Sequence, residues 1–377
     1  ALALSRVEAR AIENGKSGAR VLLHDRLSGE ERSLTPRAVI LAGGPATDRL
    51  RALAGLPTGW IAPTRGTHVL VERQRLPTDG AVIFPSPVDG RVMFLIPWPR
   101  FTVIGTTDID AASDAPVRAT RQEVRYLLDS ANGLVPAAEL READVVATWA
   151  GLRPLLAADE DSPSARSREE RIEREGALYT IAGGKLTGFR SMAERLGARV
   201  ASDLGRGDAR RHSPTRSLRL RGAFERTPSR PAWSSLDEAG RPQLSREGVE
   251  PAWQRRYAAF APAVGEFCQR VEEGRSALDP ETLLGEVDWA VRHEDCLAAR
   301  DFFLRRTDLG YGLGHGPRAV GEAVRERVLA RLAAALSWSR AKLAAEREDL
   351  ERALSAQHAW RDEGARPMSA PAALKPL

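Results

Sequence analysis

The most constraining feature of this sequence is a change in the spacing of its apolar residues. Up to residue 204, short strand-like apolar runs alternate with helical stretches, whereas from about residue 251 nearly every segment has the period of a helix. Mixed strands and helices predict an α/β or α+β fold. At 377 residues the chain also exceeds what one hydrophobic core usually supports. We therefore predict two domains, of which the second is all-helical.

The composition between these two parts predicts where they separate. Residues 205–250 are rich in Arg, Ser, Pro and Gly, which is typical of a linker. Residues 361–377 have the Pro/Ala composition of a disordered tail. The predicted domains are therefore residues 1–204 and 251–360.

The bulk properties narrow the classes of protein. The formal net charge is +5 and comes mostly from arginine, which is compatible with anionic substrates, anionic lipid or nucleic acid. No apolar stretch approaches the roughly 20 residues of a membrane span, and the first residues lack the order of a signal peptide. These features predict a cytoplasmic protein, either free in the cytoplasm or bound to the membrane face.

Cys268 and Cys296 have no metal-type spacing and lie in segments with helical character, so we expect buried thiols and no metal site.

Two apolar runs end in glycine pairs. The run AVILAGG ends at Gly43 and Gly44, and the stretch TIAGGKLTGFRSMAERL places Gly183 and Gly184 before Lys185 and a predicted helix. Such a pair lets a ligand approach the backbone, and a helix start offers unpaired N–H groups with a partial positive charge. This geometry suits an anion or an electron-rich ring, although an ordinary strand-to-helix turn has the same pattern.

Four basic residues lie at junctions in the first domain: His68, Arg153, Arg168 and Lys185. Arg153 precedes a proline at the mouth of a strand, where its planar fork suits a phosphate or carboxylate. Arg168 lies in a charged loop, where a solvated arginine is the default. His68 lies in a strand, where it fits either a structural histidine or a group that removes a proton from an alcohol. The sequence GTTD at 105–108 fits a turn and also a group that orients a neighbour.

Six stretches carry a family resemblance when taken together and in order. They are AVILAGGPATD, RGTHVLV, FLIPWPRFTVIGTTD, VVATWAGLRPLL, DSPSARSRE and TIAGGKLTGFRSMAE. In this order they resemble the FAD-dependent glycerol-3-phosphate dehydrogenases, a branch of the glycine-oxidase-like flavoprotein superfamily. The distal EVDWAVRHEDCLAARDFFLRRTDL is similar to the helical C-terminal domain of that family, so the resemblance extends to about residue 360. It implies a partial FAD/NAD(P)-binding α/β domain over residues 1–204, followed by an all-α domain.

The resemblance also implies a reaction, the oxidation of sn-glycerol 3-phosphate to dihydroxyacetone phosphate. Hydride would pass to FAD, and electrons would then pass to quinone or oxygen. Arg153 and Arg168 would hold the phosphate, and Lys185 would lie beside the flavin and the substrate oxygens. His68 would contact the reacting hydroxyl or take its proton. The residues that would approach the flavin are Gly43, Gly44, Gly183, Gly184, Leu186 and Thr187.

The sequence departs from this family pattern in three places. It contains no G-x-G-x-x-G strand-turn-helix for the ADP half of FAD, and the glycine-rich residues 310–316 lack the required spacing and predict a loop. We therefore expect an amino-terminal dinucleotide-binding segment to be encoded upstream of Ala1. The family's aromatic residue after G-G-P is Ala46 here, and its Thr-Tyr after G-G-K-L-T is Gly188-Phe189.

Two alternative functions fit the same residues. The first is a related flavin oxidase that acts on an amino or hydroxy acid. The two arginines at the anion-binding end favour a phosphate over such a substrate. The second is a truncated, inactive fragment that acts as a binding module, with the basic stretch 206–230 as its lipid or nucleic-acid arm. That stretch has eight arginines and only one aromatic residue, Phe224, so we expect a solvated linker and no nucleic-acid partner. Peripheral contact with a membrane suits a quinone-reducing enzyme, and a homodimer is compatible with the sequence.

Overall fold

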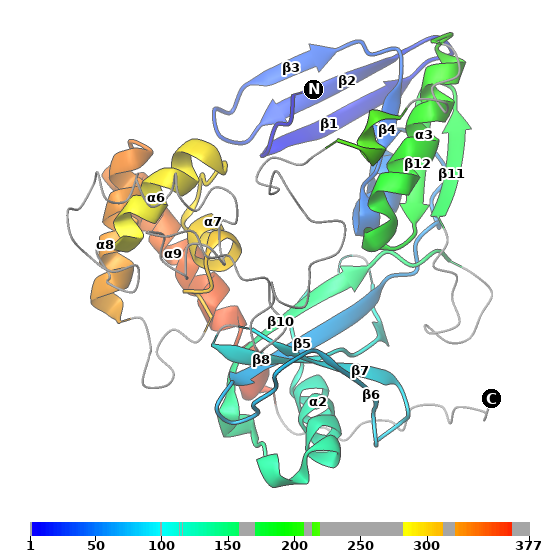
Figure 1. Cartoon of the computed structure of the whole chain (residues 1–377). Helices are drawn as coiled ribbons and strands as arrows, with labels where there is room; N and C mark the ends of the chain where they lie inside the picture. The colour runs from blue at the N-terminus through cyan, green and yellow to red at the C-terminus, as the bar shows by residue number, and fades with distance from the viewer. Residues whose placement is uncertain are drawn as a thin grey trace. The chain divides into compact units, whose positions relative to one another are not determined.

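The computed structural model describes residues 2–98, 100–112, 114, 116–157, 170–206, 213–218, 282–311 and 321–363. Spatial contacts divide the chain into two compact units, each built from several segments of the sequence (Figure 1). Unit 1 comprises Ala1–Thr67, Thr107–Val117 and Ala150–Leu218; unit 2 comprises His68–Thr106, Arg118–Trp149 and Arg219–Leu377. Most of the predicted linker and residues 364–377 of the predicted tail lie outside the described residues. The division of the sequence into 1–204 and 251–360 therefore stays a prediction.

The first sheet of unit 1 is an antiparallel meander in the order β1-β2-β3. Its strands are β1 (Val7–Asn14), β2 (Ala19–Asp25) and β3 (Glu31–Leu34). A turn through Ser28 and Gly29 joins β2 to β3, and Gly29 has a φ of +79°, a conformation that glycine adopts without strain.

The second sheet of unit 1 has the order β11-β12-β4 and contains a parallel pair. Strand β12 (Leu178–Gly183) runs parallel to β4 (Val39–Leu41) and antiparallel to β11 (Glu170–Glu175). Each of the two parallel strands leads through a 3-10 turn into a helix. These elements are η1 (Gly44–Ala46) and α1 (Thr47–Leu53) after β4, and η4 (Leu186–Gly188) and α3 (Phe189–Asp203) after β12; η5 (Pro214–Arg216) follows α3.

A buried ion pair fastens α1 to this second sheet. The side chain of Arg51 is almost completely buried, and its two terminal nitrogens donate to the carboxylate of Glu175 at 2.7 and 3.0 Å. Arg51 also donates to Thr180 Oγ1 at 2.9 Å and to the Pro57 carbonyl at 2.7 Å, and its guanidinium lies 4.1 Å from the Trp60 ring centre. These bonds satisfy a charge that would otherwise be costly to bury.

A larger antiparallel sheet has the order β10-β5-β8-β7-β6, with the short β9 paired to β5. Most of this sheet lies in unit 2, and the Arg153 end of β10, the Thr64 end of β5 and all of β9 belong to unit 1. The strands are β5 (Thr64–Glu72), β6 (Val82–Pro85), β7 (Val92–Pro97), β8 (Phe101–Gly105), β9 (Ile109–Asp110) and β10 (Val145–Arg153).

The helix α2 (Arg121–Leu134) covers one face of this sheet in unit 2. At its start, Thr120 and Glu123 form a reciprocal capping box. Two short 3-10 helices, η2 (Pro136–Ala138) and η3 (Glu142–Asp144), connect α2 to β10. The core under α2 contains Val69, Met93, Leu95, Ile104, Val124, Leu127 and Leu128. Because strand side chains alternate between faces, His68 lies on the face that α2 leaves uncovered.

The predicted helical C-terminal part is confirmed by the described residues of unit 2. Its elements are α6 (Thr282–His293), α7 (Ala299–Asp301), the π-helical η8 (Phe302–Arg306), α8 (Glu322–Ala335), α9 (Arg340–Ala356) and η9 (Ala359–Asp362). Cys296 is buried as expected, but it lies in the connection between α6 and α7 and not in a helix. The reason is that Asp295 has a φ of +53°, which ends the helical path. Cys268 and most of residues 310–316 lie outside the described residues.

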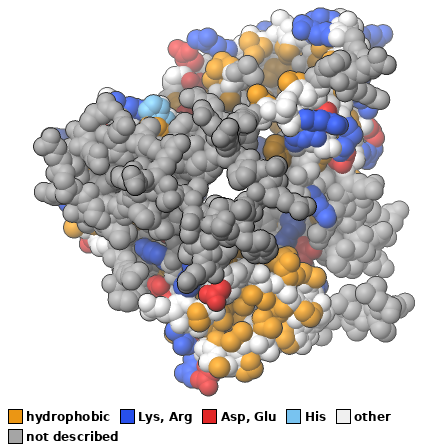
Figure 2. All heavy atoms as spheres, in the orientation of Figure 1, with side chains coloured by type: hydrophobic (Ala, Val, Ile, Leu, Met, Phe, Trp, Pro, Cys, Tyr) orange, Lys and Arg blue, Asp and Glu red, His pale blue; other side chains and the backbone are white. Residues whose placement is uncertain are grey.

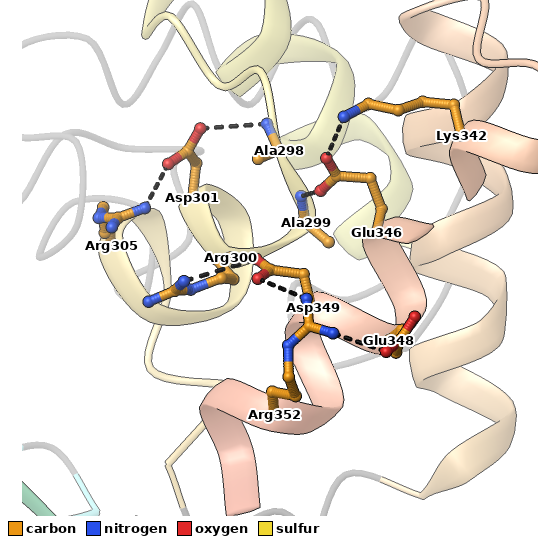
Figure 3. A network of polar contacts seen from close by, with 10 residues as sticks. All are labelled: Ala298, Ala299, Arg300, Asp301, Arg305, Lys342, Glu346, Glu348, Asp349 and Arg352. Atoms are coloured by element: carbon orange, nitrogen blue, oxygen red, sulfur yellow. Dashed lines mark hydrogen bonds and ion pairs between the residues drawn. The ribbon is translucent and has the colours of Figure 1, made fainter. Parts of the chain in front are cut away.

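Two carboxylates cap the start of the short helix α7, and one of them belongs to α9 (Figure 3). Asp301 accepts hydrogen bonds from the backbone N–H groups of Leu297 and Ala298, each at 3.1 Å. Glu346 of α9 accepts from the Ala299 N–H at 2.9 Å and from Lys342 Nζ at 2.6 Å. Carboxylates at a helix start satisfy N–H groups that have no partner within the helix, so this network has a structural role.

Hydrophobic side chains gather on the surface over the part of unit 2 where α2 and the β6–β7 hairpin are drawn (Figure 2). The large apolar residues exposed on these elements include Ile83, Val88, Val92 and Leu134. No helix in the described parts of the chain combines the length and the apolar character needed to cross a membrane.

Candidate functional site

The two predicted glycine pairs lie at one edge of the second sheet of unit 1. Strands β4 and β12 are parallel and paired from Leu178 opposite Val39 to Thr180 opposite Leu41, so their carboxyl ends emerge side by side. Gly43 and Gly44 follow β4, and Gly183 and Gly184 end and follow β12. In open α/β sheets, ligands bind at this edge, outside the carboxyl ends of parallel strands.

The glycines are required by the local geometry. Gly44, Gly183 and Gly184 have φ angles of +54°, +76° and +75°, which other residues rarely adopt. A Cβ on Gly43 would lie 2.6 Å from Leu50 Cδ1, and one on Gly184 would lie 2.6 Å from Met192 Cε. The glycines therefore let the chain turn directly from each strand into the following helix, whose side chains pack closely against the glycine backbone.

The segment after Gly184 exposes apolar side chains on which a flat cofactor could pack. Lys185, Leu186 and Thr187 are all exposed, and Leu186 and Phe189 are 89% and 61% exposed, which is unusual for apolar side chains. Gly188, which precedes α3, provides no side-chain cap for the helix start. An exposed apolar pair beside a glycine-bearing strand end and a helix N-terminus fits a ring that accepts negative charge, so these residues fit a flavin.

Arg153 is held at the end of β10 in a defined orientation. Its Nη1 donates to the Thr107 carbonyl and to Asp108 Oδ1, both at 3.1 Å. Its side chain lies across Gly66 of the neighbouring strand β5, where a Cβ would come 2.5 Å from the guanidinium carbon. About 30% of the Arg153 side chain remains exposed, against 15% for Asp108. The Arg153 side chain is therefore anchored and still partly exposed to solvent.

The GTTD stretch combines both roles that the sequence left open. Thr107 is tied to β5, because the Thr67 N–H donates to Thr107 Oγ1 at 2.9 Å and the Thr107 N–H to the Thr67 carbonyl at 3.4 Å. The turn fixed in this way presents Asp108 to Arg153. Sequence reasoning did not single out Gly66, although a glycine inside a strand is a signal of close approach by another group.

His68 lies over a glycine in the same manner within unit 2. In the antiparallel register His68 stands opposite Gly105 of β8, and a Cβ on Gly105 would lie 2.8 Å from His68 Nε2. The imidazole also stacks on the Trp149 ring, with ring centres 5.6 Å apart and planes inclined by 29°. A half-buried imidazole with a fixed plane is suited to accept a proton from a bound hydroxyl.

Arg153 and Lys185 are connected through one packed cluster of unit 1. The Ala62 N–H donates to the Leu155 carbonyl at 2.9 Å, so the segment after Arg153 pairs with the segment before β5. Leu156 then packs with Trp60, Ile61 and Ala182, the last of which is three residues before Lys185. Arg168 lies outside the described residues. The convergence of Arg153, Arg168 and Lys185 on one pocket thus stays a prediction.

No group of three or more His, Cys, Asp and Glu side chains is arranged to hold a metal ion among the described residues.

Comparison with known proteins identifies the family of the chain. The sequence pattern of the FAD dependent oxidoreductase family matches residues 2–193, which is more than half of the chain, and the chain belongs to this family. The predicted class, a flavoprotein oxidoreductase with a mixed strand and helix fold, is confirmed.

Within this class, the resemblance to glycerol-3-phosphate dehydrogenases is also confirmed. The aerobic glycerol-3-phosphate dehydrogenase of Bacillus subtilis is 30% identical over 316 residues, covering 80% of this chain and 56% of that protein. That of Staphylococcus haemolyticus is 38% identical over 186 residues, covering 48% of this chain and 33% of that protein. The glycerol-3-phosphate dehydrogenase of Bacillus halodurans, solved in complex with FAD, has a TM-score of 0.76 and 26% identity, covering 96% of this chain and 71% of that one. The chain spans about a third of the length of the Staphylococcus haemolyticus relative and just over half of the length of the Bacillus subtilis relative.

Proposed function

We propose that this chain forms the substrate-binding part and the helical part of an FAD-dependent glycerol-3-phosphate dehydrogenase. The reaction is the oxidation of sn-glycerol 3-phosphate to dihydroxyacetone phosphate. The single observation that carries this proposal is the anchored guanidinium of Arg153, which lies on Gly66 and is held by Asp108 at the end of β10. The names of the relatives and the FAD bound to the Bacillus halodurans enzyme support the same reaction.

Arg153 binds the phosphate of the substrate, together with Arg168. A guanidinium presents several N–H donors in one plane, which match two oxygens of a phosphate, and charge-assisted bonds of this type are the strong ones. The hydrogen bond from Arg153 Nη1 to Asp108 fixes this plane. The phosphate is thereby held at one end of the substrate, and the secondary alcohol is left to reach the reacting groups.

His68 accepts the hydroxyl proton as the alcohol becomes a ketone, and Lys185 lies beside the substrate oxygens. When FAD is bound, it supplies the acceptor for the hydride from the carbon, and quinone or oxygen removes the electrons afterwards. The residues that hold the flavin are Gly43, Gly44, Gly183, Gly184, Leu186 and Thr187. Exposed backbone at these glycines and the start of α3 would favour negative charge on the reduced flavin.

The test is substrate-driven bleaching of the flavin absorbance in the complete gene product. Arg153→Ala should raise the KM for glycerol 3-phosphate about 100-fold, because about 3 kcal/mol of charged hydrogen bonding is lost. Bound flavin should stay unchanged. Arg153→Lys should recover only part of the loss, since it keeps the charge without the fork. Arg75→Ala is the matched control, because Arg75 also pairs with a carboxylate, that of Asp144 at 2.8 Å.

The substrate class is tested with the same assay. Glycerol, glycine and lactate lack the phosphate that Arg153 is proposed to hold, so they should not reduce the flavin at concentrations at which glycerol 3-phosphate does. Flavin reduction by an amino or hydroxy acid alone would assign the chain to a different oxidase activity.

The acceptor and the partners follow from the same proposal. A quinone acceptor is soluble in lipid, so we expect peripheral contact with the cytoplasmic membrane face, supported by the exposed apolar side chains of the β6–β7 hairpin. Vesicle sedimentation across salt concentrations should detect this contact, and Val88→Asp in the β6–β7 turn should weaken it.

A homodimer is a further proposal, and analytical ultracentrifugation distinguishes a homodimer from a monomer. Comparing quinone with oxygen as the oxidant of the reduced protein identifies the acceptor.

A further inference from the structure

The Trp149 ring on which His68 stacks belongs to a cluster of aromatic rings in unit 2. Trp149 contacts Trp98 edge-on, with ring centres 5.3 Å apart, and Tyr311 at a tilt, with ring centres 5.4 Å apart. Trp98 and Tyr311 also touch, with centres 5.6 Å apart. The rings pack on the buried side chains of Leu70, Phe101, Val103, Val146 and Ala147. His68 is therefore one end of a series of contacts that leads to Tyr311 in the helical C-terminal part.

Tyr311 is held firmly in this cluster. Its hydroxyl donates to the Leu304 carbonyl at 3.3 Å, and its own carbonyl accepts from an Arg100 Nη2 at 3.2 Å. Burial raises the pKa of the Tyr311 hydroxyl, so the phenol stays neutral and keeps its proton for Leu304 at physiological pH. This bond adds to the ring packing against Trp98 and Trp149, which is the main support of the Tyr311 ring.

Gln357, which follows α9, forms hydrogen bonds with the residues that precede Tyr311 and Trp149 in the chain. Its Nε2 donates to the Gly310 carbonyl at 3.1 Å, next to Tyr311. The backbone carbonyl of Gln357 accepts a hydrogen bond from Thr148 Oγ1 at 2.7 Å, and Thr148 precedes Trp149. Gln357 and Thr148 are buried, so these bonds are protected from competition with water. One residue thus fixes the separation of Tyr311 and Trp149.

We propose that Tyr311 and Gln357 are positioning residues for His68, acting through Trp149. The inference rests on the proposed function for the role of His68. Tyr311 supports one side of the indole, and the indole fixes the plane of the imidazole, whose Cδ2–Nε2 edge lies over Gly105. The helical C-terminal part thereby sets the direction in which the imidazole accepts a proton, without itself touching the substrate.

The first readout does not depend on flavin or on activity. Histidine with ¹³C-labelled rings gives separate signals for the six imidazoles of the chain, and His68→Gln identifies the one from His68. The indole stacked on His68 shifts its ring signals by its ring current. Tyr311→Leu should move the His68 signals toward those of a free imidazole, while Tyr311→Phe, which keeps the ring, should leave them in place. Gln357→Met removes the bond to Gly310 and should cause a smaller shift in the same direction.

The second readout separates positioning from general destabilisation. In the complete flavin-loaded protein, Tyr311→Leu should lower the rate of flavin reduction at saturating glycerol 3-phosphate about 10- to 100-fold, since small misplacements of a reacting group have effects of this size. The KM should change less than about twofold, and Tyr311→Phe should restore the rate. Trp338→Leu, in the separate core of the C-terminal helices, is the control for loss of a large ring.

The outcomes are distinguishable. Unchanged His68 signals in both Tyr311→Leu and Gln357→Met overturn the positioning role, as does a rate loss that Trp338→Leu matches. If Tyr311→Leu does not fold, Gln357→Met decides alone, because it removes one hydrogen bond and keeps the aromatic core. Shifted His68 signals in a protein that glycerol 3-phosphate never reduces support the positioning role and overturn the proposed function instead.

Discussion

Arg153 occupies the space that a side chain at Gly66 would fill, since a Cβ at Gly66 would lie 2.5 Å from the guanidinium carbon of Arg153. The same relationship recurs in the next strand, where His68 of β5 lies over Gly105 of β8. In the strand order β10-β5-β8, each of these two functional side chains lies on a glycine of the following strand. Two glycines in the interior of a sheet therefore have a specific purpose, which is to let a long or planar side chain lie flat against the backbone.

Gly66→Ala should displace the Arg153 guanidinium and weaken anion binding. The added methyl overlaps the guanidinium, so Arg153 must leave its bonds to Thr107 and Asp108. We expect the dissociation constant for glycerol 3-phosphate to rise about 10- to 100-fold, because charged hydrogen bonds worth about 1.5–3 kcal/mol are lost. Isothermal titration measures this constant directly. Gly151→Ala in β10 is the control, since a Cβ there meets nothing within 4 Å. Equal effects of the two substitutions would contradict the assigned role of Gly66.

Gly105→Ala should act on the chemical step and not on binding. The methyl group overlaps the edge of the His68 imidazole and forces the ring out of its stack on Trp149. We expect flavin reduction to slow by about 100-fold or more, the usual contribution of a general base, with little change in the KM for glycerol 3-phosphate. Stopped-flow absorbance gives both values. Gly80→Ala, where the methyl meets nothing within 4 Å, should behave as the unaltered protein. A pure KM effect would argue that His68 binds the substrate without taking its proton.

The features predicted from sequence are those encoded within one segment. The helical period of the C-terminal part can be read within each segment, and α6, α8 and α9 confirm it. The glycine pairs after β4 and β12 were visible as ends of apolar runs, whereas their position at one edge depends on the parallel pairing that the structure shows.

The features missed are those that depend on the register between distant strands. Gly66 meets Arg153, and Gly105 meets His68, only because β10, β5 and β8 pair in one alignment, which a single sequence does not specify. The contact of Trp149 with Tyr311 joins residues far apart in the chain and has no local signal. The helical reading of Cys296 failed for a local reason, the positive φ of Asp295, which is uncommon outside glycine.

Glu175→Gln should destabilise unit 1 strongly. The variant removes the negative charge beside Arg51, whose side chain is 2% exposed, and leaves a buried cation without a counter-charge. Removing one partner of a buried ion pair typically costs about 3–5 kcal/mol, and we expect the lower value because Glu175 is itself 27% exposed. Urea denaturation followed by tryptophan fluorescence measures the change. Glu173→Gln, in the same strand and paired with Arg171 at the surface, should cost less than about 1 kcal/mol.

The carboxylate of Glu142 should make the stability of unit 2 depend on pH below about 5. Hydrogen bonds from Arg121, followed by those from Arg125, lower the pKa of Glu142 from 4.5 to about 2. The native state therefore favours the charged form, and the stabilisation is fully present above the unfolded pKa of 4.5 and is lost as the pH falls toward 2. Both arginines and Glu142 are partly exposed, so we expect about 1 kcal/mol at pH 7 for the two pairs together.

Glu142→Gln separates this contribution from the rest of the acid sensitivity. At pH 7 the variant should be about 1 kcal/mol less stable in urea denaturation, and the difference should shrink between pH 5 and pH 3 because Glu142 takes up a proton in the unfolded chain over this range. Added salt should reduce the difference at pH 7, because the pairs are close to the solvent. Glu139→Gln is the control, since Glu139 is 75% exposed and lies 3.9 Å from Arg141. A difference that persists unchanged at pH 3 would show that Glu142 stabilises the fold by packing or neutral hydrogen bonding and not through its charge.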